Sequence, residues 1–374
     1  MAGVAIGPYT PGLVADPGIA LELAEIGVGL LMFGVGLHFS IADLLAVRGL
    51  AVPGAIGQIC VAVALGAAVA IAFGATTDAA IVVGLAISVA STVVLLRTLR
   101  HRDLLDTDAG RTAVGWLIVE DLFTVLVLVL LPTIPLVRSG GSVADVVVPV
   151  VEAVAKAGIL TAIMLVIGPR VLPRALAFVE RIGSRELFTI AVLGIALGIA
   201  FAASIVFDVS LALGAFLAGA FLSESRLSDQ AASDLLPMTD VFTVLFFVSV
   251  GMLLDPAILL EEAPTILAIV AVIVVGKSAA ALAIVAVRRA PLRTGLTVAA
   301  GLAQIGEFSF IVATAGLELE LIPDDAFQVV VASALISITI NPFLFGAIEP
   351  AERRIGARPA LARLLRAGSG SPRT

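Results

Sequence analysis

The sequence predicts an all-α polytopic membrane protein with eleven full spans and a partial one at its N-terminus. Of its 374 residues, 60% are apolar and only 14% are charged, and the mean hydropathy is +1.16. A soluble domain carries about 25% charged residues. Apolar runs of membrane-spanning length recur along the chain between Arg-bearing connections. We therefore expect the chain to cross a bilayer many times.

The apolar runs give the boundaries of the predicted spans. A helix needs about 20 apolar residues to cross the hydrocarbon core. Residues 1–12 contain Pro8 and Pro11 and are too short, so we interpret them as the tail of a span whose beginning is absent. The eleven full spans are predicted at 20–38, 49–74, 78–96, 112–134, 146–168, 187–207, 209–225, 239–254, 265–287, 295–317 and 326–348.

The distribution of basic residues predicts the orientation of the spans. Short cytoplasmic loops retain Lys and Arg. Of the 22 basic residues, nineteen fall in alternate connections or after residue 350, and Arg138 stands alone on the opposite side. The remaining two, Lys156 and Lys277, lie inside spans. This pattern predicts a cytoplasmic C-terminus.

Two adjacent carboxylates, Glu120 and Asp121, lie inside the run GWLIVEDLFTVLVLVLLP. Counted from Arg111, Asp121 is about 15 Å deep, near the middle of a core about 30 Å thick. An acid there costs about 2.5 to 3.5 kcal/mol and so indicates a functional site with a partner. In such a dehydrated place a proton and a metal cation compete for the same oxygens, and this competition is sufficient to couple opposite fluxes.

Lys277 is the predicted partner. It lies about 18 Å into the ninth span, a depth similar to that of Asp121. The sequence GKS does not form a phosphate-binding loop, because Ala271 stands where that motif needs glycine and no strand precedes it. We expect Lys277 to pair with one carboxylate while the other stays free for a ligand, since neighbouring helical residues point about 100° apart. The alternative is a purely structural bridge between spans.

Polar residues interrupt the third and tenth spans at mid-depth. The third span carries Ser88, Ser91 and Thr92, and the tenth carries Gln304, Gly306, Glu307 and Ser309. Such interruptions are typical of broken helices whose freed backbone groups line a site. Residues 49–134 and 265–348 would then be inverted repeats of three spans each. Alternatively, Ser91 and Thr92 bond back to the preceding turn, and Glu307 only caps its helix.

Several motifs resemble one known family. LLMFGVGLHFS, VASTVVLLR, GWLIVEDLFTVLVLVLLP, GAFLAGAFLSES, VLFFVSVGMLLDP and GLAQIGEFSFI are similar in order and type to the Kef-type, YbaL-like branch of bacterial monovalent cation:proton antiporters. The resemblance implies a homodimer with a scaffold, a mobile core and two broken helices that cross beside the carboxylates. It assigns cation and proton binding to Asp121, and Glu120 matches a position that is Gln, Asn or Asp in relatives. It also matches Lys277 to the core lysine, and Ser91, Thr92, Gly306 and Glu307 to the crossing segments.

The predicted function is exchange of K⁺ or Na⁺ for H⁺ by alternating access, in a bacterial inner membrane. A cation efflux channel without obligatory proton coupling is the alternative. No intramembrane protease or other enzyme motif is evident, so we expect no enzymatic activity, no cofactor and no nucleic-acid partner. The predicted transport domain covers residues 1–348, without the N-terminal span of the family, and residues 349–374 form a short Arg-rich cytoplasmic tail.

Overall fold

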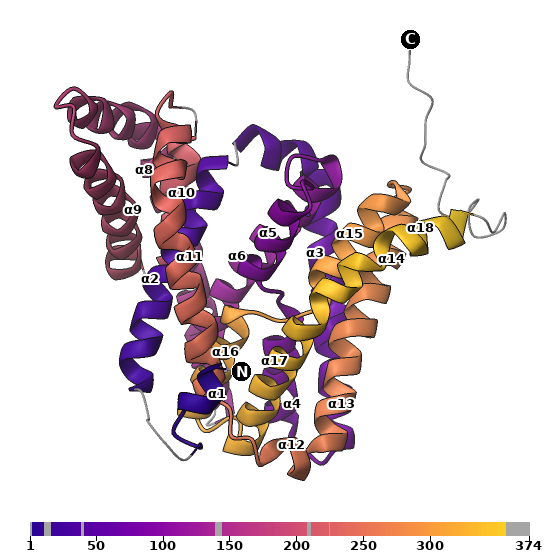
Figure 1. The fold of residues 1–374 in the computed structure, drawn as a ribbon. Coiled ribbons are helices and arrows are strands. Elements are labelled where there is room, and N and C mark those ends of the chain that lie inside the picture. Colours follow the sequence, from indigo (N-terminus) through magenta and orange to yellow (C-terminus); the bar gives the residue numbers. More distant parts are fainter. Residues whose placement is uncertain are drawn as a thin grey trace. The chain divides into compact units, whose positions relative to one another are not determined.

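The computed structural model describes residues 2–10, 16–38, 41–138, 144–207, 211–223 and 225–356, and every regular element within them is a helix (Figure 1). The chain divides into two units. The first is formed by residues 1–44 and 128–254, and the second by residues 45–127 and 255–374. Each unit therefore combines segments that are far apart in the sequence.

The first unit is a bundle in which α2 contacts several other helices. Its helices are α1 (Ala2–Ile6), α2 (Pro17–His38), α7 (Thr133–Arg138), α8 (Ala144–Glu180), α9 (Arg185–Phe207), α10 (Leu211–Leu222) and α11 (Ser228–Met252). α2 packs along both α10 and α11. A Cβ at Gly219 would lie 2.1 Å from the carbonyl oxygen of Phe33. Glycine is therefore required where α2 and α10 approach this closely, as in other membrane helix pairs.

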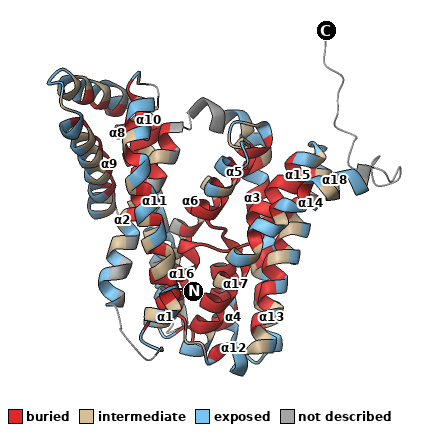
Figure 2. Cartoon of the chain, in the orientation of Figure 1, coloured by how far each residue is buried: buried red, intermediate tan, exposed pale blue. Residues whose placement is uncertain are grey.

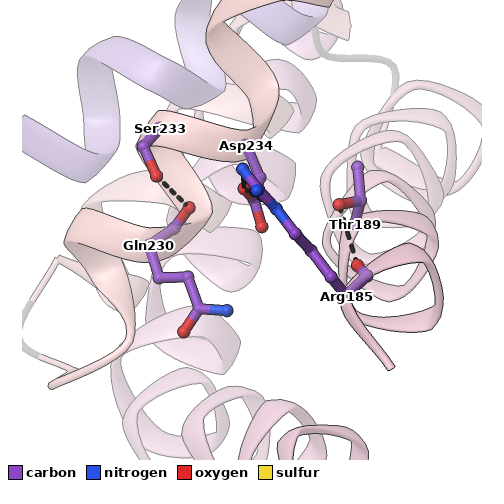
Figure 3. A network of polar contacts seen from close by, with 5 residues as sticks. All are labelled: Arg185, Thr189, Gln230, Ser233 and Asp234. Atoms are coloured by element: carbon purple, nitrogen blue, oxygen red, sulfur yellow. Dashed lines mark hydrogen bonds and ion pairs between the residues drawn. The ribbon is translucent and has the colours of Figure 1, made fainter. Parts of the chain in front are cut away.

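An ion pair joins α9 to α11 within this unit. Arg185, the first residue of α9, places Nη2 2.8 Å from Oδ1 of Asp234, and its Nε donates to the same oxygen at 3.1 Å (Figure 3). The Arg185 side chain is 79% exposed whereas that of Asp234 is 4% exposed, so the arginine supplies a counter-charge to a buried carboxylate. The polar beginning of α9 is thereby bonded to α11.

The second unit contains the predicted site residues. It holds most of α3 (Ile41–Ala72) and α6 (Asp108–Leu130), together with α4 (Thr77–Ser88), α5 (Thr92–His101), α12 (Ile258–Glu261), α13 (Ala263–Ala271), a π-helical turn (Val272–Gly276), α14 (Lys277–Val287), α15 (Leu292–Leu302), α16 (Glu307–Glu318), α17 (Asp324–Gly346) and α18 (Ile348–Gly356). α4 packs against α16 and α17, while α14 packs against α15.

Burial differs greatly among the apolar helices. In the segment Thr77–His101, which contains α4 and α5, 89% of an apolar stretch of 18 residues is buried. In Val147–Gly168 of α8 the corresponding share is 13% (Figure 2). A segment so enclosed can carry polar side chains and irregular backbone, because it does not face lipid. The interruption between α4 and α5 lies in this segment.

Each of the eleven predicted runs overlaps in sequence with one or more helices. Within the described residues, seven helices are long and apolar enough to cross a membrane, and the bent pair α15 and α16 makes an eighth if counted as one span. The count of eleven therefore stays a prediction. Three helices extend well beyond their apolar runs, because backbone hydrogen bonding continues where hydropathy falls: α3 begins at Ile41, α8 ends at Glu180 and α11 begins at Ser228. Residues 357–374 of the predicted tail lie outside the described residues.

Candidate functional site

The first interruption separates α4 from α5. α4 ends at Ser88, the backbone at Val89 and Ser91 is extended, and α5 begins at Thr92. Ser91 caps α5, since its Oγ accepts a hydrogen bond from the amide of Val94 at 3.2 Å. Serine is a favoured residue at this position, where it satisfies one of the free amides of the first turn. The break predicted around Ser88, Ser91 and Thr92 is present.

The second interruption separates α15 from α16 and crosses the first. α15 ends at Leu302, α16 begins at Glu307, and the two helices are bent by 42°. Gly306 lies against Ser91, because a Cβ at Gly306 would be 2.4 Å from the Cα of Ser91. The two predicted breaks therefore touch at their backbones, and only glycine fits at position 306.

Replacing Gly306 with alanine tests this contact. The added methyl group would meet backbone, so one break must shift, and we expect a loss of about 1 to 3 kcal/mol of stability together with reduced transport. Gly198→Ala is the matched control, because a Cβ there meets nothing within 4 Å. Apparent melting temperatures of the two purified variants provide the comparison. Equal melting temperatures would show that the two backbones are not in contact.

α6 directs both of its carboxylates at the first break. Glu120 is fully buried, and its Oε2 accepts the amide of Ala90 at 2.8 Å, while its Oε1 has no hydrogen-bond partner. Asp121 is 5% exposed, and its Oδ2 accepts from the hydroxyl of Thr92 at 3.2 Å. The two acids are thus held at residues 90 and 92, on the two sides of Ser91. The Thr92 hydroxyl therefore donates to the Asp121 carboxylate and not to a backbone carbonyl of the preceding turn.

Lys277 reaches the other break. A π-helical turn, a feature frequent at functional sites, immediately precedes it. Its Nζ is fully buried and donates to the backbone carbonyl of Gln304 at 3.1 Å. The ion pairs within 4.0 Å among the described residues do not include Lys277, so the expected direct pair with Glu120 or Asp121 is not seen here. Lys277 and Glu120 nevertheless attract each other electrostatically.

Glu307 is a third acid at the crossing. It is the first residue of α16, where the helix dipole favours a negative charge. Its Oε2 accepts from the hydroxyl of Ser91 at 3.2 Å, and its buried Oε1 has no hydrogen-bond partner. Glu307 and Asp121 repel each other electrostatically. Glu307 is thus both a helix-terminal acid and part of the charge at the site.

Comparison with known proteins identifies the family. The model of the sodium/hydrogen exchanger transmembrane family matches residues 1–348. The chain belongs to this family. It is 52% identical to the putative cation/proton antiporter YbaL of Escherichia coli (strain K12) over 93% of its own length and 63% of that protein. It is also 29% identical to the putative K(+) efflux antiporter KefB of Alkalimonas amylolytica, over 92% of this chain and 51% of the relative.

A solved antiporter shares the fold. The sodium/proton antiporter MjNhaP1 of Methanocaldococcus jannaschii at pH 8 matches with a TM-score of 0.65 and 16% sequence identity, over 93% of this chain and 89% of that one. The chain is therefore a multi-pass membrane protein of the sodium/hydrogen exchanger family, and it spans less than two thirds of the length of YbaL.

Two buried amides of this exchanger-family protein are not found by sequence reasoning. Gln58 of α3 donates its Nε2 to the carbonyl of Ser88 at 3.1 Å, and Asn341 of α17 donates its Nδ2 to the carbonyl of Ala300 at 2.7 Å. Both side chains are fully buried, and each satisfies a carbonyl in the last turn of a helix that ends at a break. The available signal is an amide within an apolar run: Gln58 is alone in 49–74, and Asn341 shares 326–348 with Gln328.

The arrangement suits reversible binding of a small cation. Three buried acids and one buried ammonium surround two helix breaks, and two carboxylate oxygens, Oε1 of Glu120 and Oε1 of Glu307, have no hydrogen-bond partner. Buried charges need counter-charges, so protons or cations must neutralise the excess acids. Across the described ranges, no group of three or more His, Cys, Asp or Glu residues is arranged to hold a resident metal ion.

Proposed function

We propose that this protein is a secondary active antiporter that exchanges a monovalent cation, K⁺ or Na⁺, for H⁺ by alternating access. The observation that carries the proposal is the place of Asp121, a buried acid at the crossing of two broken helices whose partner is the Thr92 hydroxyl. Its oxygens retain lone pairs for a proton or a cation. Binding one excludes the other, which couples their fluxes.

In this proposal the neighbours of Asp121 divide the remaining tasks. Glu120 holds the first break through Ala90 and leaves one oxygen for the cation shell. Backbone carbonyls at the two breaks complete that shell with their remaining lone pairs, as backbone does in other transporters. Lys277 balances part of the negative charge from its place on the carbonyl of Gln304. The ions are cargo, and no cofactor takes part.

The proposal includes the inverted repeats of residues 49–134 and 265–348. Their first predicted spans, 49–74 and 265–287, make a similar contact: Gln58 of α3 donates to a carbonyl at the first break, and Lys277, which begins α14, donates to one at the second. Such a correspondence is what two repeats of one ancestral unit would retain. Eleven full spans, the transport domain at 1–348, a cytoplasmic tail at 349–374, a homodimer and a bacterial inner-membrane location complete the proposal.

Transport in everted membrane vesicles tests the proposal. With a pH-sensitive dye, adding KCl or NaCl to acidified vesicles that contain the protein should release protons, and vesicles without the protein should not. Side-by-side KCl and NaCl titrations identify the cation. Single-channel currents in planar bilayers, independent of a proton gradient, would instead support the efflux channel and contradict exchange.

A further inference from the structure

Gln304 connects the two breaks through both ends of its side-chain amide. It lies between α15 and α16 and is fully buried. Its Oε1 accepts the amide of Ser91 at 3.0 Å, and its Nε2 donates to the carbonyl of Ser91 at 3.1 Å and to that of Gly301 at 3.0 Å. One side chain therefore pairs with both backbone groups of Ser91, much as a neighbouring strand would.

All four charged groups of the site are attached close to this contact, and Glu120 accepts the amide of Ala90, the residue before Ser91. Thr92, which holds Asp121, directly follows Ser91 in the chain. The hydroxyl of Ser91 itself donates to Glu307. Lys277 donates to the backbone carbonyl of Gln304. A shift of Ser91 relative to Gln304 would consequently move Asp121 and Glu307 relative to Lys277.

We propose that Gln304 is the positioning residue that locks the two crossing breaks together and thereby sets the geometry of the cation and proton site. An amide is needed because the contact requires an acceptor for one N–H and a donor for two carbonyls. The lock keeps three acids and one ammonium in a fixed arrangement while access alternates. The part of the proposal that concerns transport rests on the proposed exchange function.

The lock itself is tested without transport. Gln304→Met keeps the approximate volume and removes every polar contact of the side chain. In lipid nanodiscs, we expect hydrogen–deuterium exchange in peptides covering residues 89–92 and 303–306 to become faster by on the order of tenfold, because a buried amide loses its acceptor. Gln304→Glu keeps the acceptor but lacks the donor, so hydrogen–deuterium exchange at the breaks should also become faster. This variant replaces Gln304→Met in the test if the Met variant does not fold.

Gln328→Met is the matched control. Gln328 is a buried glutamine of the same unit, and its Oε1 accepts the amide of Asp255 at 3.0 Å, on segments that do not form either break. We expect this variant to alter hydrogen–deuterium exchange near Asp255 and to leave the amides of both breaks protected from it. Wild-type protection at the breaks in Gln304→Met would overturn the proposed lock.

Transport kinetics test the positioning role. Gln304→Met and Gln304→Glu should raise the apparent KM for the cation by on the order of tenfold, with a smaller effect on the maximal rate, since the ligands are displaced but not removed. An unchanged KM for the cation, together with faster hydrogen–deuterium exchange at the breaks, would overturn the positioning role. Failure of the proposed cation/proton exchange would show differently, as no cation-induced proton release from wild-type vesicles while the protection at the breaks still depends on Gln304.

Discussion

Asp121→Asn is expected to reduce cation-induced proton release in everted vesicles to the level of vesicles without the protein. Asparagine keeps the size of the side chain and can still accept from Thr92, but it can neither carry the negative charge nor bind a transported proton. Because one carboxylate carries both ions in the proposed cycle, neither flux should remain. The dye assay with KCl and with NaCl measures this directly.

The matched control for this prediction is Glu262→Gln. Glu262 is a partly buried acid of the same unit that accepts from the hydroxyl of Thr265 at 2.7 Å, far along the chain from both breaks. It should transport at the wild-type rate when expressed to the same level. Exchange that persists undiminished in Asp121→Asn would place the transported ions elsewhere and refute the assignment.

Lys277→Met is expected to be the most destabilising single substitution at the site. It removes the ammonium that donates to the carbonyl of Gln304 and that attracts Glu120. The buried carbonyl of Gln304 then loses its donor, which costs about 1 to 3 kcal/mol, and Glu120 loses a nearby opposite charge, which adds to that cost. We expect the apparent melting temperature of the purified protein to fall by several degrees, with loss of exchange.

A double-mutant cycle separates the electrostatic part of this loss. Glu120→Gln removes the charge that Lys277 opposes but keeps an acceptor for the amide of Ala90. The double variant should therefore be more stable than the sum of the two single effects predicts, by about 0.5 to 3 kcal/mol. Strictly additive losses would mean that Lys277 acts through its hydrogen bond to Gln304 alone.

Hydropathy was sufficient to predict most helices and both interruptions. The runs at 78–96 and 295–317 were predicted to be broken because Ser88, Ser91, Gly306 and Glu307 cluster at mid-depth, and helices end at Ser88 and Leu302. The ends of α8 and α11 were not predictable in this way, because hydropathy reports contact with lipid whereas a helix continues as long as its backbone bonds do.

The contacts within the site were less predictable than its members. Sequence reasoning placed Lys277 opposite a carboxylate at similar depth, whereas its Nζ bonds to a backbone carbonyl that exists only because α15 ends at Leu302. Gln58 and Asn341 were missed for the same reason, since they bond to carbonyls near the end of α4 and α15. These acceptors are backbone carbonyls at helix ends, and the side chains in a sequence do not reveal which carbonyls will be available there.

Proton release on cation binding to the purified protein tests the central claim most directly. In weakly buffered detergent solution, adding K⁺ or Na⁺ to the wild-type protein should release protons in proportion to the cation bound, and Asp121→Asn should release none. Choline chloride controls for ionic strength. Cation binding without proton release, or equal release from Asp121→Asn, would contradict competition of the two ions for Asp121.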